Sequence, residues 1–204
     1  LGAAYEGNGS FQYRCQNKAL SKMKFLSTEI KEVIIIEPDV FQDDRGFFME
    51  TFRANLLAEN GINYQFVQDN HSGSKKNILR GLHYQIKNPQ GKLVRAIRGQ
   101  IFDVAVDLRR SSNTFGKWVA IILSEENKKI FWIPPDFAHG YYVLSDWAEI
   151  VYKATDYYAP EYDRSLLWND PDLGIDWPIP SGIEPLLSQK DRKASRLKEA
   201  EVYD

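Results

Sequence analysis

Short segments of strand-forming residues follow one another along most of the chain, and turn-forming residues separate them. Many of these segments are rich in β-branched and aromatic side chains, a composition typical of strands on a half-buried sheet surface. They include Val33–Ile36, Tyr64–Asn70, Leu79–Gln85, Lys92–Arg98, Ile101–Asp107, Lys117–Leu123, Lys129–Ile133, Tyr141–Leu144 and Glu149–Ala154. Within this region only Leu56–Asn60, closed by Gly61, has the composition of a helix. The pattern predicts an all-β sandwich or barrel with a few short peripheral helices.

Length and the first residues indicate how the chain is organised. With 204 residues it is long enough for one domain with a substantial core. Residues 1–22 are mostly polar, contain the run Gly7–Ser10 and lack the apolar stretch of a secretory signal. We therefore expect a dispensable extension over residues 1–22, with Met23 as a candidate start. The β domain should cover residues 23–204 and end in a polar helix that begins near Ser188.

Charge and cysteine content exclude several classes of protein. The formal net charge is -2 and the pI is about 6.0, so no global basic field is available to hold a nucleic acid. Any anion site must be built from a few local cations, which favours a small anionic ligand. The single cysteine, Cys15, cannot form an internal disulfide, and no apolar run approaches the roughly 20 residues that cross a bilayer. These features predict a cytoplasmic protein that binds neither nucleic acid nor membrane.

The segment Leu79–Gln85 carries polar residues that a fully buried strand would lack. At a period of two, His83 shares one face with Leu79 and Gln85, whereas Arg80 lies on the other face. Such polar groups indicate that the strand borders a wet cavity inside a β-barrel. Taken alone, His83 equally fits a satisfied structural residue and Arg80 a surface ion pair. For both to reach one ligand, the strand must bulge or Arg80 must lie near its end.

Three blocks around this strand carry a family resemblance. Phe66–Ser72, Leu79–Gln85 and Gly91–Arg95 occur in the same order in the dTDP-4-dehydrorhamnose 3,5-epimerases, which are cupin-like jelly rolls, and closely resemble them. The resemblance covers about Phe25 to Asp191. It implies a homodimer without a cofactor that inverts C3 and C5 of dTDP-4-dehydro-6-deoxy-D-glucose, forming dTDP-4-dehydro-L-rhamnose in deoxysugar biosynthesis. Because an open jelly roll exposes strand edges, Val33–Ile36 is our candidate for the edge that pairs two subunits.

The resemblance assigns a catalytic role to four residues. His83 would be the base, because an imidazole titrates near neutral pH, and Asp191 would bond to its other ring nitrogen. Lys92 would stabilise negative charge on the C4 oxygen of the sugar. Tyr152 would deliver a proton from the opposite face, although without the resemblance it reads as a packed core tyrosine.

Further residues would hold the nucleotide sugar, again by resemblance. Arg45 by itself reads as a solvated turn residue, yet in the family it binds the diphosphate. Tyr158 would stack on the thymine ring, and Asp163 stands where the family often has a glutamate, one methylene longer. His139 would contact the substrate from a loop, Phe137–Gly140, that enters a strand. The complete set of predicted binding residues is Arg45, Glu50, Gln68, Asn70, Arg80, His139, Tyr158, Asp163 and Lys190.

Three alternatives remain open at this point. An epimerase that inverts only C3 would share these residue types. A metal cupin would need a His-x-His pair, and the sequence His83-Tyr84-Gln85 breaks that pair, so no metal site is predicted. A non-catalytic sugar- or nucleotide-binding jelly roll would keep the aromatic residues and arginines but would not need His83, Lys92 and Tyr152 together.

Overall fold

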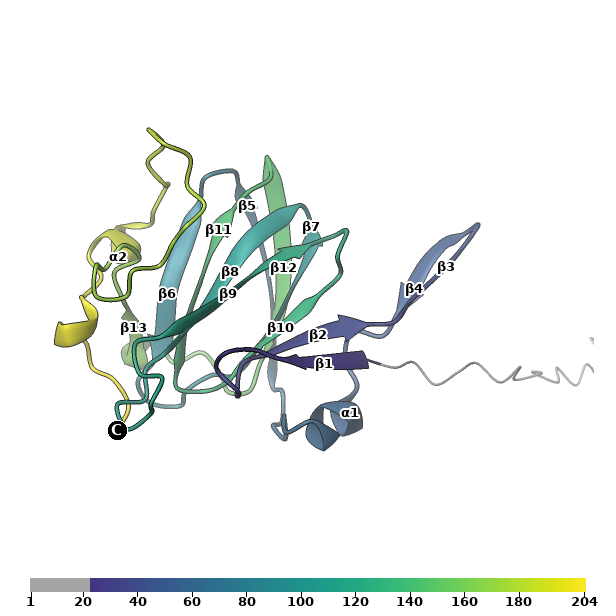
Figure 1. The fold of residues 1–204 in the computed structure, drawn as a ribbon, viewed down its shortest axis with the longest axis horizontal. Helices are drawn as coiled ribbons and strands as arrows, with labels where there is room; N and C mark the ends of the chain where they lie inside the picture. Colours follow the sequence, from purple (N-terminus) through teal and green to yellow (C-terminus); the bar gives the residue numbers. More distant parts are fainter. Residues whose placement is uncertain (1–22) are drawn as a thin grey trace, which may run out of the picture.

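The computed structural model describes residues 23–204, which form two antiparallel sheets packed face to face (Figure 1). The six-stranded sheet contains, in spatial order, β1 (Met23–Ser27), β2 (Ile34–Pro38), β10 (Ile130–Ile133), β7 (Lys92–Arg98), β12 (Trp147–Ala154) and β5 (Gln68–Lys75). The five-stranded sheet contains β13 (Asp163–Ser165), β6 (Leu79–Gln85), β11 (Phe137–Val143), β8 (Gln100–Asp107) and β9 (Trp118–Ser124). This arrangement is a cupin-like jelly roll, so the predicted fold class is confirmed. The predicted extension over residues 1–22 lies outside the described residues.

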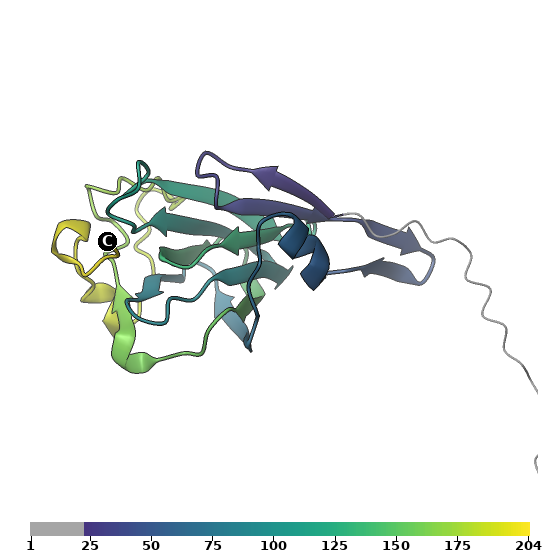
Figure 2. The same cartoon turned by 90° about the horizontal axis from the view of Figure 1, so that it is seen from below.

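A hairpin and two short helices lie outside the two sheets. Strands β3 (Val40–Asp43) and β4 (Gly46–Met49) form a two-stranded hairpin that projects away from the sandwich in both views (Figures 1 and 2). Helix α1 (Ala54–Glu59) matches the predicted helix, and Gly61 follows it with φ +86°, as expected of a left-handed cap. Helix α2 (Gln189–Arg192) lies beside β6. No helix in residues 23–204 is long and apolar enough to cross a membrane.

The core extends beyond the space between the sheets. The inner cluster joins residues of both sheets, among them Val94, Ala105 and Phe131, all fully buried. A second cluster lies on the outer face of the five-stranded sheet, where Val104 and Val106 of β8 pack under the C-terminal segment. Strand β8 is therefore buried on both faces, although its alternating sequence predicts one wet face. Each fully buried aliphatic side chain contributes roughly 1.5–3 kcal/mol, so this covering holds the C-terminal segment against the sheet.

Two predictions about the N-terminal half are wrong. The segment Val33–Ile36 is not a free edge, because β2 pairs with β1 on one side and with β10 on the other. The outer strand is Met23–Ser27, which sequence analysis treated only as a candidate start. The strand predicted over Tyr64–Asn70 begins only at Gln68. Before it, Tyr64 and Phe66 pack on Trp132 rather than joining a ladder.

Two predictions near the C-terminal half also need correction. The segment Phe137–Gly140 is not a loop, since it forms the first half of β11 and is buried throughout. Strand β11 pairs with β6 and β8, so its backbone groups are satisfied on both sides. The predicted C-terminal helix has only four residues, Gln189–Arg192, because the chain beyond it returns to the sheet, where Ser195 pairs with Leu166. Ser188 caps this helix by accepting a hydrogen bond from the Asp191 N–H.

Candidate active site

A cavity of about 330 Å³ lies between the two sheets and gathers most of the predicted site residues. The predicted residues that line it are Arg80, His83, Lys92, His139, Tyr152, Tyr158, Asp163 and Lys190. They come from both walls, since β6, β11 and β13 belong to one sheet and β7 and β12 to the other. The cavity is rich in cations within a chain of net charge -2. It therefore fits the local anion site that composition required.

His83 and Asp191 form a close pair on one wall of the cavity. The Nε2 atom of His83 lies 2.5 Å from Oδ1 of Asp191, which is almost completely buried. The Ser188 hydroxyl donates to the other carboxylate oxygen at 2.7 Å. Burial alone would raise the pKa of Asp191, but the bond from His83, aided by Ser188 and the charge of Lys190, holds that pKa below its usual value. Asp191 thus stays ionised and leaves Nδ1 of His83 free for a ligand.

A bulge brings Arg80 and His83 into the same cavity. Along the β6–β11 pair, His139 faces His83 and Tyr141 faces Arg80, so one residue of β11 stands opposite two of β6. Gly81, at φ +112°, occupies the bulge, and a Cβ there would lie 2.5 Å from the Cα of Gly140. The extra residue reverses the alternation and brings both side chains to the cavity. Arg80 is also the second residue of β6, so both arrangements that the sequence left open, a bulge and a position near the strand end, are present.

Lys92 presents a buried ammonium group to the cavity. Its side chain is 7% exposed, and within residues 23–204 its Nζ makes no hydrogen bond or ion pair. Burial lowers the pKa of Lys92 to about 8, against the opposing charges of Asp163 and Asp103. A buried cation without a close partner is costly in the free protein, and a ligand oxygen would relieve that cost.

Tyr152 reaches the cavity from the sheet opposite His83. Its strand, β12, pairs with β7 and β5, and Tyr152 lies beside Val94 and Asn70 across the sheet. Burial raises the pKa of Tyr152, the nearby Tyr141 hydroxyl raises it further, and Arg80 partly offsets the rise. The phenol is therefore protonated at neutral pH and can serve as a proton donor.

His139 belongs to a second histidine–carboxylate pair. Its Nε2 lies 2.9 and 3.1 Å from the two carboxylate oxygens of Asp103. Asp103 is fully buried, and that burial raises its pKa against the opposing effect of His139. Asp103 therefore lies beneath His139 on β8, a position that the alternation of residues along β8 could not reveal.

Asp163 joins two residues at the exposed side of the cavity. Its Oδ2 accepts a hydrogen bond from the Tyr158 hydroxyl at 3.0 Å and forms an ion pair with Lys190. The Tyr158 ring itself is 56% exposed. The Asp163 carboxylate is thus occupied within the chain.

Gln68 and Asn70 lie beside the cavity and bond to each other. Gln68 Nε2 donates to Asn70 Oδ1 at 2.9 Å, and Gln68 Oε1 accepts from the Tyr158 N–H at 2.9 Å. The Nδ2 group of Asn70 is buried and has no partner among the described residues. The amide of Gln68 is therefore used inside the protein, whereas Asn70 still has a donor to offer.

Arg45 and Glu50 are not brought into this cavity. Arg45 lies at the tip of the β3–β4 hairpin with its side chain 89% exposed and paired with Asp43. Glu50 follows β4 and bonds to Arg53 at 2.6 Å through Oε1, while its buried Oε2 has no partner in the described chain. Within one chain, these two residues are separate from the other predicted binding residues.

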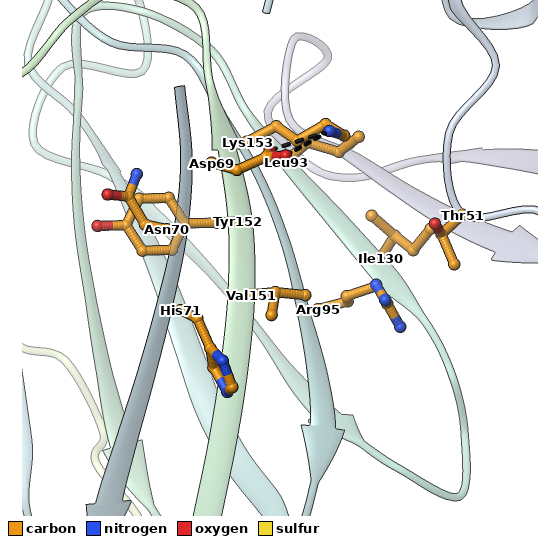
Figure 3. Close-up of a pocket in the computed structure, with 10 residues that line it drawn as sticks. All are labelled: Thr51, Asp69, Asn70, His71, Leu93, Arg95, Ile130, Val151, Tyr152 and Lys153. Carbon is orange, nitrogen blue, oxygen red and sulfur yellow. Dashed lines mark hydrogen bonds and ion pairs between the residues drawn. The ribbon is translucent and has the colours of Figure 1, made fainter. Parts of the chain in front are cut away.

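A second pocket, of about 340 Å³, opens on the outer face of the six-stranded sheet. Figure 3 shows Tyr152 and Asn70 projecting from one side of their strands, while Val151 and Arg95 lie on the other side. The ion pair of Asp69 with Lys153 closes one side of this pocket at 2.9 Å. Its histidine, His71, is exposed and pairs with Glu149 on the outer surface of the same sheet. The inner cavity instead gathers cations and two histidine–carboxylate pairs between both sheets, so it is the candidate active site.

Sequence analysis assigned no role to several residues of the cavity. Gln85, Gln90 and Tyr141 line it, and Asp103 supports it from beneath. Gln85 shares a face with His83 at a period of two, which was the one available signal. No group of three or more potential metal ligands occurs in residues 23–204.

Comparison with known proteins identifies the family. Residues 27–199 match the family model described as dTDP-4-dehydrorhamnose 3,5-epimerase. The protein of that name from Pseudomonas aeruginosa is 54% identical over 182 residues, which cover 89% of this chain and 99% of that protein. Its counterpart from Methanothermobacter thermautotrophicus is 51% identical over 184 residues, 90% of this chain and 100% of that protein.

A solved structure agrees with these sequence matches. It is the dTDP-6-deoxy-D-glucose-3,5-epimerase of Legionella pneumophila Philadelphia 1 in complex with dTDP-4-keto-L-rhamnose. The two chains share 52% identity with a TM-score of 0.85, over 88% of this chain and 95% of that chain. The chain therefore belongs to the dTDP-4-dehydrorhamnose 3,5-epimerase family.

Proposed function

We propose that this chain is an epimerase that inverts C3 and C5 of dTDP-4-dehydro-6-deoxy-D-glucose and forms dTDP-4-dehydro-L-rhamnose. The observation that carries the proposal is the His83–Asp191 pair on one wall of a cavity whose other wall presents Tyr152 and Lys92. The family supports the choice of substrate, since its members are named for this reaction. The reaction moves protons without a change of oxidation state, so no redox cofactor is needed.

His83 acts as the base. The C4 carbonyl makes the hydrogens on C3 and C5 acidic, because the negative charge left behind spreads onto the C4 oxygen. His83 removes such a proton through Nδ1, the nitrogen that Asp191 leaves free. Asp191 fixes the imidazole tautomer and stabilises the imidazolium that forms. Such a positioned base contributes roughly 10²–10⁴-fold to the rate.

Lys92 stabilises the enolate. Its ammonium group is buried and lacks a close partner in residues 23–204, so it can donate directly to the C4 oxygen as negative charge grows there. A fixed donor in a sheltered cavity is worth more than one in water, because the effective dielectric constant is lower.

Tyr152 completes the inversion from the opposite side. His83 belongs to β6 of the five-stranded sheet and Tyr152 to β12 of the six-stranded sheet, so a sugar between the sheets has the base on one face and the acid on the other. A proton removed on one face and returned on the other inverts the carbon. Because C3 and C5 both flank the C4 carbonyl, the same two residues can treat both carbons in turn.

The remaining cavity residues bind the nucleotide sugar. Arg80 and Lys190 supply positive charge for the diphosphate, and the exposed ring of Tyr158 supplies a surface on which thymine can stack. His139 contacts the sugar, held in place by Asp103. Asn70 offers its free amide hydrogen, and Gln68 orients that amide.

A homodimer is part of the proposal. Arg45 and Glu50 lie outside the cavity of their own chain, on or next to a projecting hairpin that exposes Phe41, Phe47 and Phe48. Exposed aromatic side chains on a projecting element are typical of a contact surface. We place this hairpin against a second subunit, where Arg45 would reach the diphosphate.

A cytoplasmic location also belongs to the proposal. The single cysteine, Cys15, fits a reducing compartment, and the proposed substrate is an activated sugar.

The function is tested with the purified protein, extensive chelation and dTDP-4-dehydro-6-deoxy-D-glucose, followed by NMR. We expect inversion at C3 and C5 without added metal. Activity that returns only with a divalent ion would support the metal cupin instead. Binding without turnover would indicate a non-catalytic jelly roll, and inversion at C3 alone would indicate a single-carbon epimerase.

A further inference from the structure

The segment of residues 156–159, which we call the Tyr158 loop, is held by side chains rather than by a backbone ladder. It leaves β12 and leads to β13 in the opposite sheet. Three glutamines satisfy its peptide groups, and we call Gln68, Gln85 and Gln90 the glutamine clamp. Gln90 Nε2 donates to the Asp156 carbonyl at 2.8 Å, and Gln68 Oε1 accepts from the Tyr158 N–H at 2.9 Å.

Gln85 makes the largest number of these contacts. Its Oε1 accepts from the Ala159 N–H at 2.8 Å, and its Nε2 donates to the carbonyls of Tyr157 at 3.2 Å and Asn88 at 2.7 Å. The side chain is only 4% exposed, so an unpaired group here would be costly. The site needs two donors and one acceptor in one plane, which an amide supplies and a carboxylate does not.

These contacts surround Tyr158 on both sides in the sequence. The Tyr157 carbonyl and the Ala159 N–H are both bonded to Gln85, so the backbone that carries Tyr158 has little freedom. The Tyr158 ring itself remains 56% exposed at the cavity. Its direction is therefore set by the clamp and by the single bond from its hydroxyl to Asp163.

Gln85 also lies two residues after His83 on the same strand. One end of β6 thus carries the proposed base and, on the same face, the side chain that fixes the Tyr158 loop. This arrangement couples the position of a ring at the cavity edge to the position of the base. A nucleotide that stacks on Tyr158 would therefore lie at a fixed distance from His83.

We propose that Gln85 is a positioning residue that sets nucleotide affinity through Tyr158, by holding residues 157–159 in the conformation that presents the ring. The proposal rests on the proposed function, since it takes the ligand to be a nucleoside diphosphate. Gln85 has no part in proton transfer and does not need to touch the ligand.

The test measures the Kd for dTDP with Gln85→Ala, Tyr158→Ala and the double variant. Gln85→Ala should weaken dTDP binding roughly tenfold, within the range expected for loss of base stacking, and should leave kcat within about threefold of the parent. In the Tyr158→Ala background the same substitution should change the Kd by less than about twofold, because its effect passes through the ring. A tenfold effect that persists without the ring overturns the proposal. Loss of kcat with unchanged Kd also overturns it.

The conservative variant Gln85→Glu provides a second readout and keeps the side-chain shape if Gln85→Ala does not fold. Below its pKa a buried glutamic acid can donate to one carbonyl, whereas its carboxylate would face two carbonyl oxygens. Relative to the parent at the same pH, dTDP binding should be weaker at about pH 8 than at about pH 6. If the loss of dTDP affinity in Gln85→Glu is the same at both pH values, the result counts against the role of the glutamine clamp.

The matched control is Gln100→Ala, also on the five-stranded sheet, whose side chain makes no hydrogen bond in the described chain. It should leave the Kd unchanged, and an effect equal to that of Gln85→Ala overturns the proposal.

Amide hydrogen exchange provides a further measurement. The Ala159 N–H should exchange faster in Gln85→Ala than in the parent, and Gln100→Ala should not show this change. If the parent protein binds dTDP but does not epimerise dTDP-4-dehydro-6-deoxy-D-glucose, the proposed function is wrong. The Kd values for dTDP still decide the role of Gln85 in that case.

Discussion

The inner cavity and the β3–β4 hairpin carry different parts of the predicted site, and they differ in how firmly one chain holds them. In the cavity, His83, Lys92 and Tyr152 stand on strands that are hydrogen-bonded on both sides. On the hairpin, Arg45 is 89% exposed at the tip of a two-stranded element. The groups proposed for proton transfer are thus held on rigid strands within one chain, whereas Arg45, proposed to bind the diphosphate, lies outside that cavity. Cavity variants should therefore change rate constants, and hairpin variants should change KM.

The largest effect is expected from His83→Ala. Without the base no proton leaves the sugar, so turnover should fall by roughly 10⁴-fold, the upper end for one general base. The control is His71→Ala, because His71 lies on the outer sheet face and, among residues 23–204, its side chain bonds only to Glu149. Steady-state kinetics should separate the two variants, and equal losses would place the chemistry outside the inner cavity.

Lys92→Met should lower activity and raise the stability of the folded protein. Loss of the donor at the C4 oxygen should lower kcat by roughly 10²–10³-fold. The folded-state pKa of about 8 lies below the ordinary value of 10.5, so the buried ammonium destabilises the free protein below pH 8. The variant should gain up to about 3 kcal/mol in unfolding free energy at neutral pH, and this gain should disappear as the pH rises towards 10.5.

Denaturant unfolding of Lys92→Met and the exposed control Lys76→Met measures this difference. Lys76 is 54% exposed and its one ion pair within the described part of the chain is with Asp146, so its replacement should change stability little. If Lys92→Met is less stable than the parent at neutral pH, the Lys92 side chain stabilises the folded protein, and the account of a destabilising buried ammonium is wrong.

The pH dependence of kcat/KM should show the titration of Lys92. Below its pKa of about 8 the group is a cation, and above it the neutral amine stabilises an enolate poorly. We expect kcat/KM to fall about tenfold per pH unit above pH 8. An alkaline limb that persists unchanged in Lys92→Met would assign the titration to another group.

The smallest effect is expected on the hairpin, where Arg45→Ala should raise KM by roughly tenfold and leave kcat nearly unchanged. If Arg45 serves the partner subunit, mixing Arg45→Ala with His83→Ala subunits should restore one intact site per mixed dimer. The mixture should then regain parent-like KM. No regain, together with a monomer in sedimentation, would contradict the proposed dimer. Arg98→Ala, at an exposed strand end, is the control.

Residues and periodicity predicted much of the fold, because turn chemistry and alternation act locally. Helix α1 with its Gly61 cap follows from short-range rules, as do most of the strands. Strand-pairing partners do not follow from short-range rules. Val33–Ile36 was our candidate for an edge strand, yet β1 pairs with it on its outer side. The C-terminal helix failed for the same reason, since residues after Arg192 gain more by packing on a distant sheet than by continuing a polar helix.

The candidate site shows the same limit. The pairing of His83 with Asp191 spans 108 residues, and only the family resemblance connected them. Asp103 escaped assignment because alternation gives the face of a strand but not what covers that face. Gln85 escaped because its role depends on a loop more than 70 residues away.

The central claim is that base and acid act from opposite walls, and Tyr152→Phe in deuterated water tests it most directly. Phenylalanine keeps the ring but cannot return a proton, while His83, Asp191 and Lys92 can still form the enolate. NMR should show deuterium entering the substrate, most readily at C3, while inversion falls by roughly 10²–10⁴-fold. If Tyr152→Phe inverts both carbons at nearly the parent rate, Tyr152 is a packing residue and the two-wall account is wrong.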